Sequence, residues 1–400
     1  MNNRISSNMM YDQSVFLMLS RQSKMNQLER QLATGQKLVT AKDDPVAAGT
    51  AVGMDRVLAE LEQLGANAAN VQNRLGLQEN ALAQAGELLT RVTELTVEAN
   101  NAALSAEDRK SVSAELKSVR DALFSLANST DGSGRYLFGG SNDGAPPFSS
   151  INGSIVYNGD QTQRQVEVAP GSFVQDALPG SEIFMRIRTG DGSIDGNAAA
   201  GNTGQGVLTN ISRDGSATWN GESYTVRFSG PDTYDILDEF GNPVGGGTYA
   251  EGEDIVFQGL RMQLTGEPVA GDEFNVGQAG NRDVFSTIDR LVQALNMDTA
   301  TSADRTAQQN LLQSSLRDVA RASEKMIDAR AAGGAQLSAI DNATSLREAN
   351  SITLKDLLSQ LRDLDYAEAI GQYQLEKASL QAAQTIFTQM QSMSLFNMIR

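Results

Sequence analysis

The sequence predicts an α + β fold: a long antiparallel helical bundle or coiled coil, formed by both ends of the chain, with an inserted β-rich domain. Apolar residues recur every seven positions near each end, which is typical of helices that pack along a seam. Residues 141–280 instead hold 24 of the 37 glycines and 12 of the 22 aromatic residues. Such a chain leaves along one set of helices and returns along another, so we expect its two ends to lie together.

The first segment, residues 1–45, is predicted to be an N-terminal polymerising helix. Its seam contains residues spaced seven apart, namely Tyr11, Met18, Met25 and Leu32. Gly35 is expected to interrupt this helix, since glycine adopts the left-handed conformation that ends helices. Asp44 and Pro45 then supply a helix cap and a first-turn proline for the next helix.

The second segment, residues 46–140, is predicted to be the first part of a helical bundle. Its main seam runs through Leu61, Ala68, Leu75, Leu82 and Leu89. A further helix follows Ser105. The start of this helix resembles a capping box, because an acidic residue, Asp108, stands three positions after Ser105.

The third segment, residues 141–280, is predicted to be an outward β-rich domain. Its acidic residues outnumber its basic ones by 19 to 6, a net charge of −13 out of −17 for the whole chain. Short alternating runs such as 182–188 and 223–228 favour strands, and Asn220-Gly221 predicts a two-residue hairpin turn. We expect a small sandwich or barrel.

Helical periodicity resumes in residues 281–360, the predicted second part of the bundle. The last segment, residues 361–400, is predicted to be the C-terminal polymerising helix. Its seam repeats every seven residues through Tyr366, Tyr373, Leu380 and Phe387, and Met390, Leu395 and Phe396 add further apolar surface.

The composition argues against an enzyme. The chain has neither histidine nor cysteine, which removes the commonest general base, the commonest metal ligand and any thiolate site. We therefore predict no catalytic residues, no metal and no cofactor. The acidic balance disfavours nucleic acid as a partner, and no apolar run is long enough for a membrane span or a cleaved signal peptide.

The remaining motifs have plain structural interpretations. The pair Asp43 and Asp44 is better explained by helix capping than by acid–base chemistry. Residues 191–196 are spaced like the start of a calcium loop, but position twelve is Asn202, so a glycine-rich turn is favoured. The glycines of 201–206 and 245–247 predict loops, Gly333-Gly334 indicates close packing or a hinge, and Trp219 is expected in the β core or a hairpin.

The terminal seams have to be buried against something. The two terminal helices can pair as a hairpin within one chain, but a two-helix pair covers only one side of each helix. Phe16 and Leu17 lie off the seam, and neighbouring copies of the chain are the natural remaining cover. We therefore predict a ring or tubular layer whose terminal helices become ordered on assembly. The predicted interface is Tyr11, Met18, Met25, Leu32, Tyr366, Tyr373, Leu380, Phe387, Met390, Leu395 and Phe396.

Several stretches resemble a known family. LATGQKL (32–38), AKDDPVAA (41–48) and LTVEANN (95–101) are similar to the N-terminal half of the bacterial flagellin superfamily, and LQAAQTIF (380–387) and SLFNMIR (394–400) to its C-terminal signature. Within that superfamily, RISSNMMYDQS (4–14), YLFGG (136–140) and FQGLRMQLTGEPVAGDEFNV (257–276) resemble the flagellar hook-associated protein 3 family. The resemblance covers roughly two-thirds of the chain, in order at both ends.

The resemblance implies a structural role in the bacterial flagellum, outside the cell. Members of this family form the hook–filament junction, between the first hook-associated protein and flagellin. They pass through the flagellar type III export apparatus without a cleaved signal, and a cytosolic export chaperone holds their C-terminal helix. The alternatives are a flagellin filament subunit and, from another class, a secreted coiled-coil adhesin whose β insert binds a host ligand.

Overall fold

The computed structural model describes the backbone of residues 7–100, 104–215 and 217–398, and side chains in these ranges except at positions 7, 8, 10 and 390–398. The described chain forms two compact units. We call residues 1–66 and 343–400 the terminal unit and residues 67–342 the central unit. The helices are α1 (Ser7–Thr34), α2 (Pro45–Ala99), α3 (Ala106–Ala127), α4 (Val284–Leu295), α5 (Ser302–Arg362) and α6 (Tyr366–Met398).

The predicted helix boundaries are confirmed by their local chemistry. Helix α1 stops at Gly35, whose φ of +69° is the left-handed conformation that glycine adopts without strain. Helix α2 begins at Pro45, and the Asp44 carboxylate accepts hydrogen bonds from the backbone N–H groups of residues 46 and 47, both 3.0 Å long. Helix α3 begins with the complete capping box of Ser105 and Asp108.

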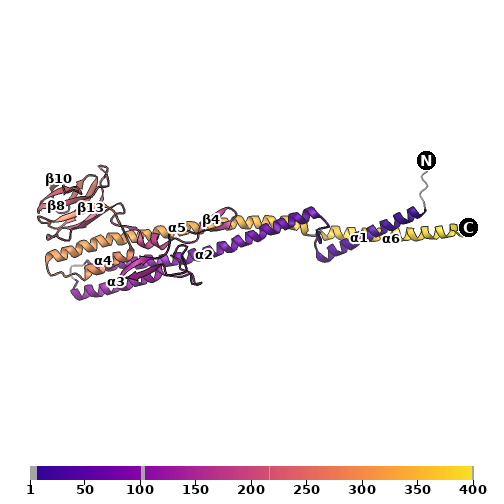
Figure 1. Cartoon of the computed structure of the whole chain (residues 1–400), viewed down its shortest axis with the longest axis horizontal. Coiled ribbons are helices and arrows are strands. Elements are labelled where there is room, and N and C mark those ends of the chain that lie inside the picture. Colours follow the sequence, from indigo (N-terminus) through magenta and orange to yellow (C-terminus); the bar gives the residue numbers. More distant parts are fainter. Residues whose placement is uncertain (1–6, 101–103, 216, 399–400) are drawn as a thin grey trace. The chain divides into compact units, whose positions relative to one another are not determined.

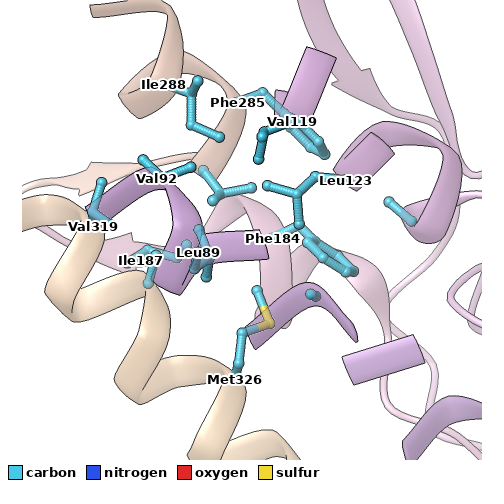
Figure 2. Packing of buried hydrophobic residues seen from close by; sticks show 14 of the residues in the cluster. Leu89, Val92, Val119, Leu123, Phe184, Ile187, Phe285, Ile288, Val319 and Met326 are labelled. Atoms are coloured by element: carbon cyan, nitrogen blue, oxygen red, sulfur yellow. The ribbon is translucent and has the colours of Figure 1, made fainter. Parts of the chain in front are cut away.

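The core of the central unit joins α2, α3, α4 and α5. Figure 2 shows Leu89 of α2, Leu123 of α3 and Ile288 of α4 converging with side chains of α5. Phe285 lies among three other rings, with centroids 5.9 Å from Phe148 and 6.2 Å from both Phe124 and Phe184. The aliphatic seams therefore form a closed interior with an aromatic group at one side.

The first part of the glycine-rich region belongs to this helical core. The prediction of a strand over 182–188 is wrong for most of that run, which forms a short π-helical turn, η1 (Ser181–Met185), and only Ile187–Arg188 is a strand. The turn inserts Ile183 and Phe184 into the helical core, and Phe148 and Ile155 of the first two strands join them. The helical frame itself ends at Ala127, before the predicted limit of 140. The predicted segment 141–280 is thus divided between two cores. Its early strands are β1 (Phe148–Ile151), β2 (Ser154–Tyr157), β3 (Gln165–Ala169), β4 (Ser172–Gln175) and β5 (Ile187–Arg188).

A second, separate core lies between two antiparallel sheets. One sheet has the order β10-β9-β8-β13-β6 and the other β11-β12-β7, and rings such as Phe228, Tyr249 and Phe274 fill the space between them. Figure 1 shows β8, β10 and β13 gathered in one group, separate from β4. The strands of the two sheets are β6 (Ile194–Ala198), β7 (Val207–Arg213), β8 (Tyr224–Gly230), β9 (Thr233–Leu237), β10 (Pro243–Thr248), β11 (Asp254–Phe257), β12 (Leu260–Thr265) and β13 (Glu273–Gln278). The last strand, β14 (Asn281–Arg282), pairs instead with β5.

Two further local predictions in this region are wrong. Asn220-Gly221 does not join a hairpin, because β7 pairs with β12 while β8 pairs with β9 and β13. It forms a turn between sheets, with Trp219 packed at the edge of the second core. Gly245–Gly247 form the middle of edge strand β10 and not a loop. A Cβ on Gly246 would lie 2.7 Å from the Tyr234 carbonyl oxygen, so the close approach of β9 requires glycine there.

Two further glycine motifs are also settled locally. Asp191 closes a tight turn, its carboxylate accepting hydrogen bonds from the N–H groups of residues 193 and 194 at 2.7 and 2.6 Å. Gly333 and Gly334 lie within the unbroken helix α5, and added Cβ atoms would meet nothing within 4 Å. Close packing therefore does not explain the glycine pair.

Candidate assembly surface on the terminal helices

The two predicted terminal seams face each other within one chain. Helices α1 and α6 run antiparallel and side by side (Figure 1). The register follows from three contacts: Tyr11 with Phe387, Arg21 with Glu376 and Glu29 with Tyr373. A heptad seam on each helix can satisfy the other in this arrangement, as in an antiparallel coiled coil.

The predicted interface residues divide into two sets. Met18, Met25, Leu32, Tyr373, Leu380 and Phe387 are half-buried along the seam, whereas Tyr11 and Tyr366 are about half exposed. The side chains of Met390, Leu395 and Phe396 lie outside the described residues. The predicted intramolecular hairpin is therefore present, while the role of these residues in assembly stays a prediction.

Polar contacts at the rim of the seam hold its register. The Arg21 guanidinium lies 3.0 Å from the Glu376 carboxylate. The Tyr373 hydroxyl donates a 2.9 Å hydrogen bond to Glu29, and this bond raises the pKa of the phenol above its usual value. The Arg21–Glu376 pair is only partly buried and the Tyr373–Glu29 bond is exposed, so both mainly select the alignment of the two helices.

A short joint connects this hairpin to the rest of the terminal unit. The Lys37 N–H donates to the Arg362 carbonyl oxygen at 2.7 Å, and the Leu364 N–H donates to the Gly35 carbonyl oxygen at 3.0 Å. Asp43, one of the paired carboxylates, accepts a 2.8 Å hydrogen bond from the Thr40 N–H, which holds its pKa below the usual value. Its role is to order this turn, in agreement with the structural interpretation.

The hairpin leaves much of its apolar surface uncovered. Among the described hydrophobic residues of α1 and α6, only Leu28 and Ala369 are fully buried. Phe16 is 72% exposed and Leu375 is 67% exposed. We call the exposed large apolar side chains of these two helices the outer surface: Met9, Tyr11, Phe16, Leu17, Leu19, Tyr366, Ile370, Leu375 and Ile386.

Most of the outer surface was not among the predicted interface residues. The seven-residue seams do not include Leu19, Ile370, Leu375 or Ile386. A prediction based on one seam for each helix therefore omits them. The sequence feature that could have predicted these residues is a second apolar stripe on helices that already have a seam. The same excess continues on α2 and α5 of the terminal unit, where Val46, Val52, Val57, Leu346, Ile352 and Leu357 are exposed.

Elsewhere the side-chain chemistry is that of structural ion pairs. Arg74 of α2, buried in the central unit, faces Asp131, Asp143 and Asp176 at 3.5, 3.5 and 3.8 Å. Burial lowers the pKa of Arg74, against the opposing effect of these carboxylates. Within the described residues no group of three acidic side chains is arranged to hold a metal ion, and no helix there is long and apolar enough to cross a membrane.

Comparisons with known proteins agree with this architecture. Residues 5–143 match the model of the bacterial flagellin N-terminal helical region. Flagellar hook-associated protein 3 of Salmonella typhimurium is 27% identical over 99% of this chain and 100% of its own length. The crystal structure of Xanthomonas campestris FlgL has a TM-score of 0.73 and is 60% identical over 76% of this chain and 99% of that chain.

A further solved structure, described as the flagellar junction protein FlgL from Legionella pneumophila, has a TM-score of 0.69 and 28% identity. It matches over 80% of this chain and all of that chain. The match to the Salmonella protein runs over 99% of this chain and so includes both the helical frame and the β insert, whereas the flagellin model is confined to residues 5–143. The chain therefore belongs to the flagellar hook-associated protein 3 (FlgL) family.

Proposed function

We propose that this chain is a structural subunit of the bacterial flagellum that forms the hook–filament junction by packing its terminal helices against those of neighbouring copies. The observation that carries the proposal is the outer surface of α1 and α6. A hairpin that only half-buries its seam and leaves nine large apolar side chains exposed is an incomplete structure in water.

The energetic argument favours association. Fully burying one large apolar side chain contributes about 1.5–3 kcal/mol, and the hairpin presents such side chains on both helices. Two isolated helices are also marginal by themselves, since helix stability in proteins comes mainly from packing. A ring or tubular layer of copies covers the outer surface on every subunit at once, because each copy contacts the next through the same residues.

The position in the flagellum follows from the family. A junction subunit contacts the first hook-associated protein on one side and flagellin on the other, and it reaches the cell exterior through the flagellar type III apparatus. A cytosolic chaperone that covers the C-terminal helix would shield the outer surface before export. The absence of cysteine suits a chain that is exported unfolded, because no disulfide can form on the way.

The first experiment changes the outer surface without touching the seam. Phe16→Asp and Ile386→Asp should each abolish filament formation and motility, because a charge has to be buried at the contact between copies. The matched control is Phe173→Asp, which alters a 58% exposed phenylalanine of β4 in the central unit and should leave motility intact. Motile Phe16→Asp cells with normal protein levels would refute the assembly role.

A seam variant separates the hairpin from the assembly. Leu380→Asp and Phe387→Asp are expected to block assembly too, but also to loosen α6 from α1, which proteolysis of the isolated protein detects. Outer-surface variants should leave that proteolysis pattern unchanged.

Location distinguishes the junction from its alternatives. Immunogold labelling of intact flagella should mark a narrow band next to the hook. Labelling along the whole filament would indicate a flagellin, and a deletion strain with normal filaments but lost adhesion would indicate an adhesin.

A further inference from the structure

A cleft of about 250 Å³ lies between the β insert and the helices of the central unit. Its walls come from the end of β6 and the loop after it, from α4 and from the first turns of α5. Most of the lining is small or apolar, including Ala303, Ala307, Met297 and Leu311. Arg290 is the cationic residue of the lining.

Arg290 lacks a carboxylate partner within ion-pair distance among the residues that the structure describes. Its guanidinium makes a single long hydrogen bond, 3.4 Å, to the Ser314 hydroxyl. Asp318, a carboxylate close enough to act on Arg290, is already bound to Arg282 and accepts a hydrogen bond from the Gly190 N–H. Arg282 and Arg317 are further cations near Arg290, so three guanidinium groups share the carboxylates of Asp318 and Asp195.

The cleft therefore fits a carboxylate carried on an apolar group. A guanidinium in a partly desolvated site binds a carboxylate through paired, charge-assisted hydrogen bonds, and Met297 and Leu311 offer contact to an apolar body. The other large clefts of the described chain differ in this respect. The one around Arg74 supplies its own aspartates, and the one beside Asp195 is lined by Asp238 and Glu239 without a cation.

The chain carries a matching knob on the turn between β9 and β10. Phe240, at its tip, is 80% exposed, and among the large apolar residues described only Val46 is as exposed. Glu239, beside it, is exposed and has no ion pair in the described part of the chain. The turn is held rigid by Asp238, whose carboxylate accepts hydrogen bonds from the N–H groups of Phe240 at 2.9 Å and Asn242 at 2.7 Å. A preformed knob loses little entropy on binding.

We propose that the Arg290 cleft of one copy receives the Glu239–Phe240 tip of a neighbouring copy, the glutamate pairing with Arg290 and the ring contacting Met297 and Leu311. The inference rests on the proposed function, since it assumes that copies stand side by side. Charge selects this occupant: the β-rich region has a net charge of −13, so neighbouring copies repel each other unless an acidic group of one meets a free cation of the other.

Cysteine crosslinking tests the contact directly, because the natural chain has no cysteine. Cells co-express two single variants, Phe240→Cys and Ala303→Cys, and their purified flagella are treated with a mild oxidant. A disulfide-linked pair of chains is expected. The matched control replaces Phe240→Cys with Phe173→Cys, another exposed phenylalanine, and should give no more product than random collision.

A charge exchange gives an independent measurement. Arg290→Glu or Glu239→Arg alone should lower the crosslink yield about ten-fold, the effect of losing roughly 1.4 kcal/mol of contact energy. Combining Arg290→Glu with Glu239→Arg should restore it. If Phe240→Cys is lost from flagella while Phe173→Cys is retained, the charge exchange gives the test. Rescue of filament assembly by Arg290→Glu combined with Glu239→Arg supports the contact. Failure of that combination to rescue assembly overturns it.

The outcomes separate this inference from the proposed function. If the variants are present in flagella at normal amounts and the crosslink does not exceed the control, the cleft contact is wrong while the junction role stands. If the natural protein is itself missing from purified flagella, the proposed function is wrong, and the cleft contact as stated falls with it.

Discussion

Replacing Arg74 with methionine is the perturbation whose consequence the structure defines most closely. Arg74 is the one cation that faces all three carboxylates of Asp131, Asp143 and Asp176, whose side chains are 13%, 13% and 7% exposed. It also donates a 2.8 Å hydrogen bond to the Tyr136 carbonyl oxygen. Methionine keeps the apolar stem and removes the charge, which leaves the three carboxylates facing each other with Arg164 and the more exposed Arg135 as their remaining close cations.

The expected loss of stability at neutral pH is about 3–5 kcal/mol, the usual cost of removing one partner from a buried ion pair. For a domain of this size that corresponds to a fall of the melting temperature by very roughly 10 °C, at about 2–4 °C per kcal/mol. Arg135→Met is the matched control. Arg135 lies 3.7 Å from Asp131 but is 54% exposed, so its removal should cost less than about 1 kcal/mol.

The difference between Arg74→Met and the natural protein should depend on pH. Hydrogen bonds from Ser133 first, and the Arg74 charge among the smaller causes, hold the pKa of Asp131 below its usual value. A carboxyl whose folded pKa is lowered stabilises the fold above its unfolded pKa, about 3.9, and loses that contribution as the pH falls through the folded pKa. In Arg74→Met the guanidinium charge no longer lowers the pKa of Asp131, so that pKa rises. The stability gap should therefore be widest near pH 7 and shrink below about pH 4, as Asp131 becomes neutral in the folded and unfolded chains.

The assay is urea unfolding of the full chain, followed at several pH values by far-ultraviolet circular dichroism for the helices and by fluorescence of the single tryptophan, Trp219, for the β insert. Arg74→Met should shift the helical transition, and the tryptophan transition should shift less, because Trp219 packs on the second core. A gap that stays constant from pH 7 to pH 3, or one below 1 kcal/mol at pH 7, would refute the account of this cluster.

Three further predictions follow from the packing. Phe285→Ala should lower the unfolding free energy by about 3–5 kcal/mol, whereas Phe173→Ala, on an exposed strand, should stay within about 0.5 kcal/mol; equal effects in a urea titration would contradict the assigned core. Replacing residues 190–279 with a short glycine–serine linker should leave the helical core folded. A short linker can span the gap because its two ends are already in contact: the Thr189 N–H donates to the Gly280 carbonyl oxygen at 3.1 Å. Loss of the cooperative helical transition in circular dichroism would show that the two cores depend on each other. Gly35→Ala should weaken the joint of the terminal unit by about 1–2 kcal/mol, since φ is +69° and the new Cβ would lie 2.8 Å from the Tyr366 hydroxyl oxygen. The control Gly49→Ala, in open space on α2, should be neutral or stabilising. Hydrogen exchange of α6 that is faster in Gly49→Ala than in Gly35→Ala would contradict this account of the joint.

Local signals in the sequence predicted the helical frame well. The stop at Gly35, the start at Asp44-Pro45 and the capping box at Ser105 each depend on a few adjacent residues and on backbone geometry. The seven-residue seams likewise predicted which faces of the helices are covered, because a repeat near the helical period fixes a face whatever the partner is.

The β insert could be predicted only in outline. Asn220-Gly221 has the composition of a hairpin turn, yet its flanking strands belong to different sheets, because pairing in a sheet depends on residues far away in the sequence. No local sequence pattern predicted that residues 141–280 are divided between two cores. Phe148 and Phe184 fall within the predicted β-rich segment, and only the packed structure shows them in the helical core.

The candidate interface shows the same division. Spacing alone selected the seam residues Tyr373, Leu380 and Phe387, and they do lie along a helix–helix contact. Which contact that is depends on the hairpin, which uses the seam within one chain and leaves Phe16, Leu375 and Ile386 outside. Residue type and periodicity thus determined the helices, their ends, the acidic insert and the absence of histidine and cysteine chemistry. Tertiary structure decided which apolar surfaces stay uncovered, because exposure depends on every element that packs nearby, and no local stretch of sequence contains that information.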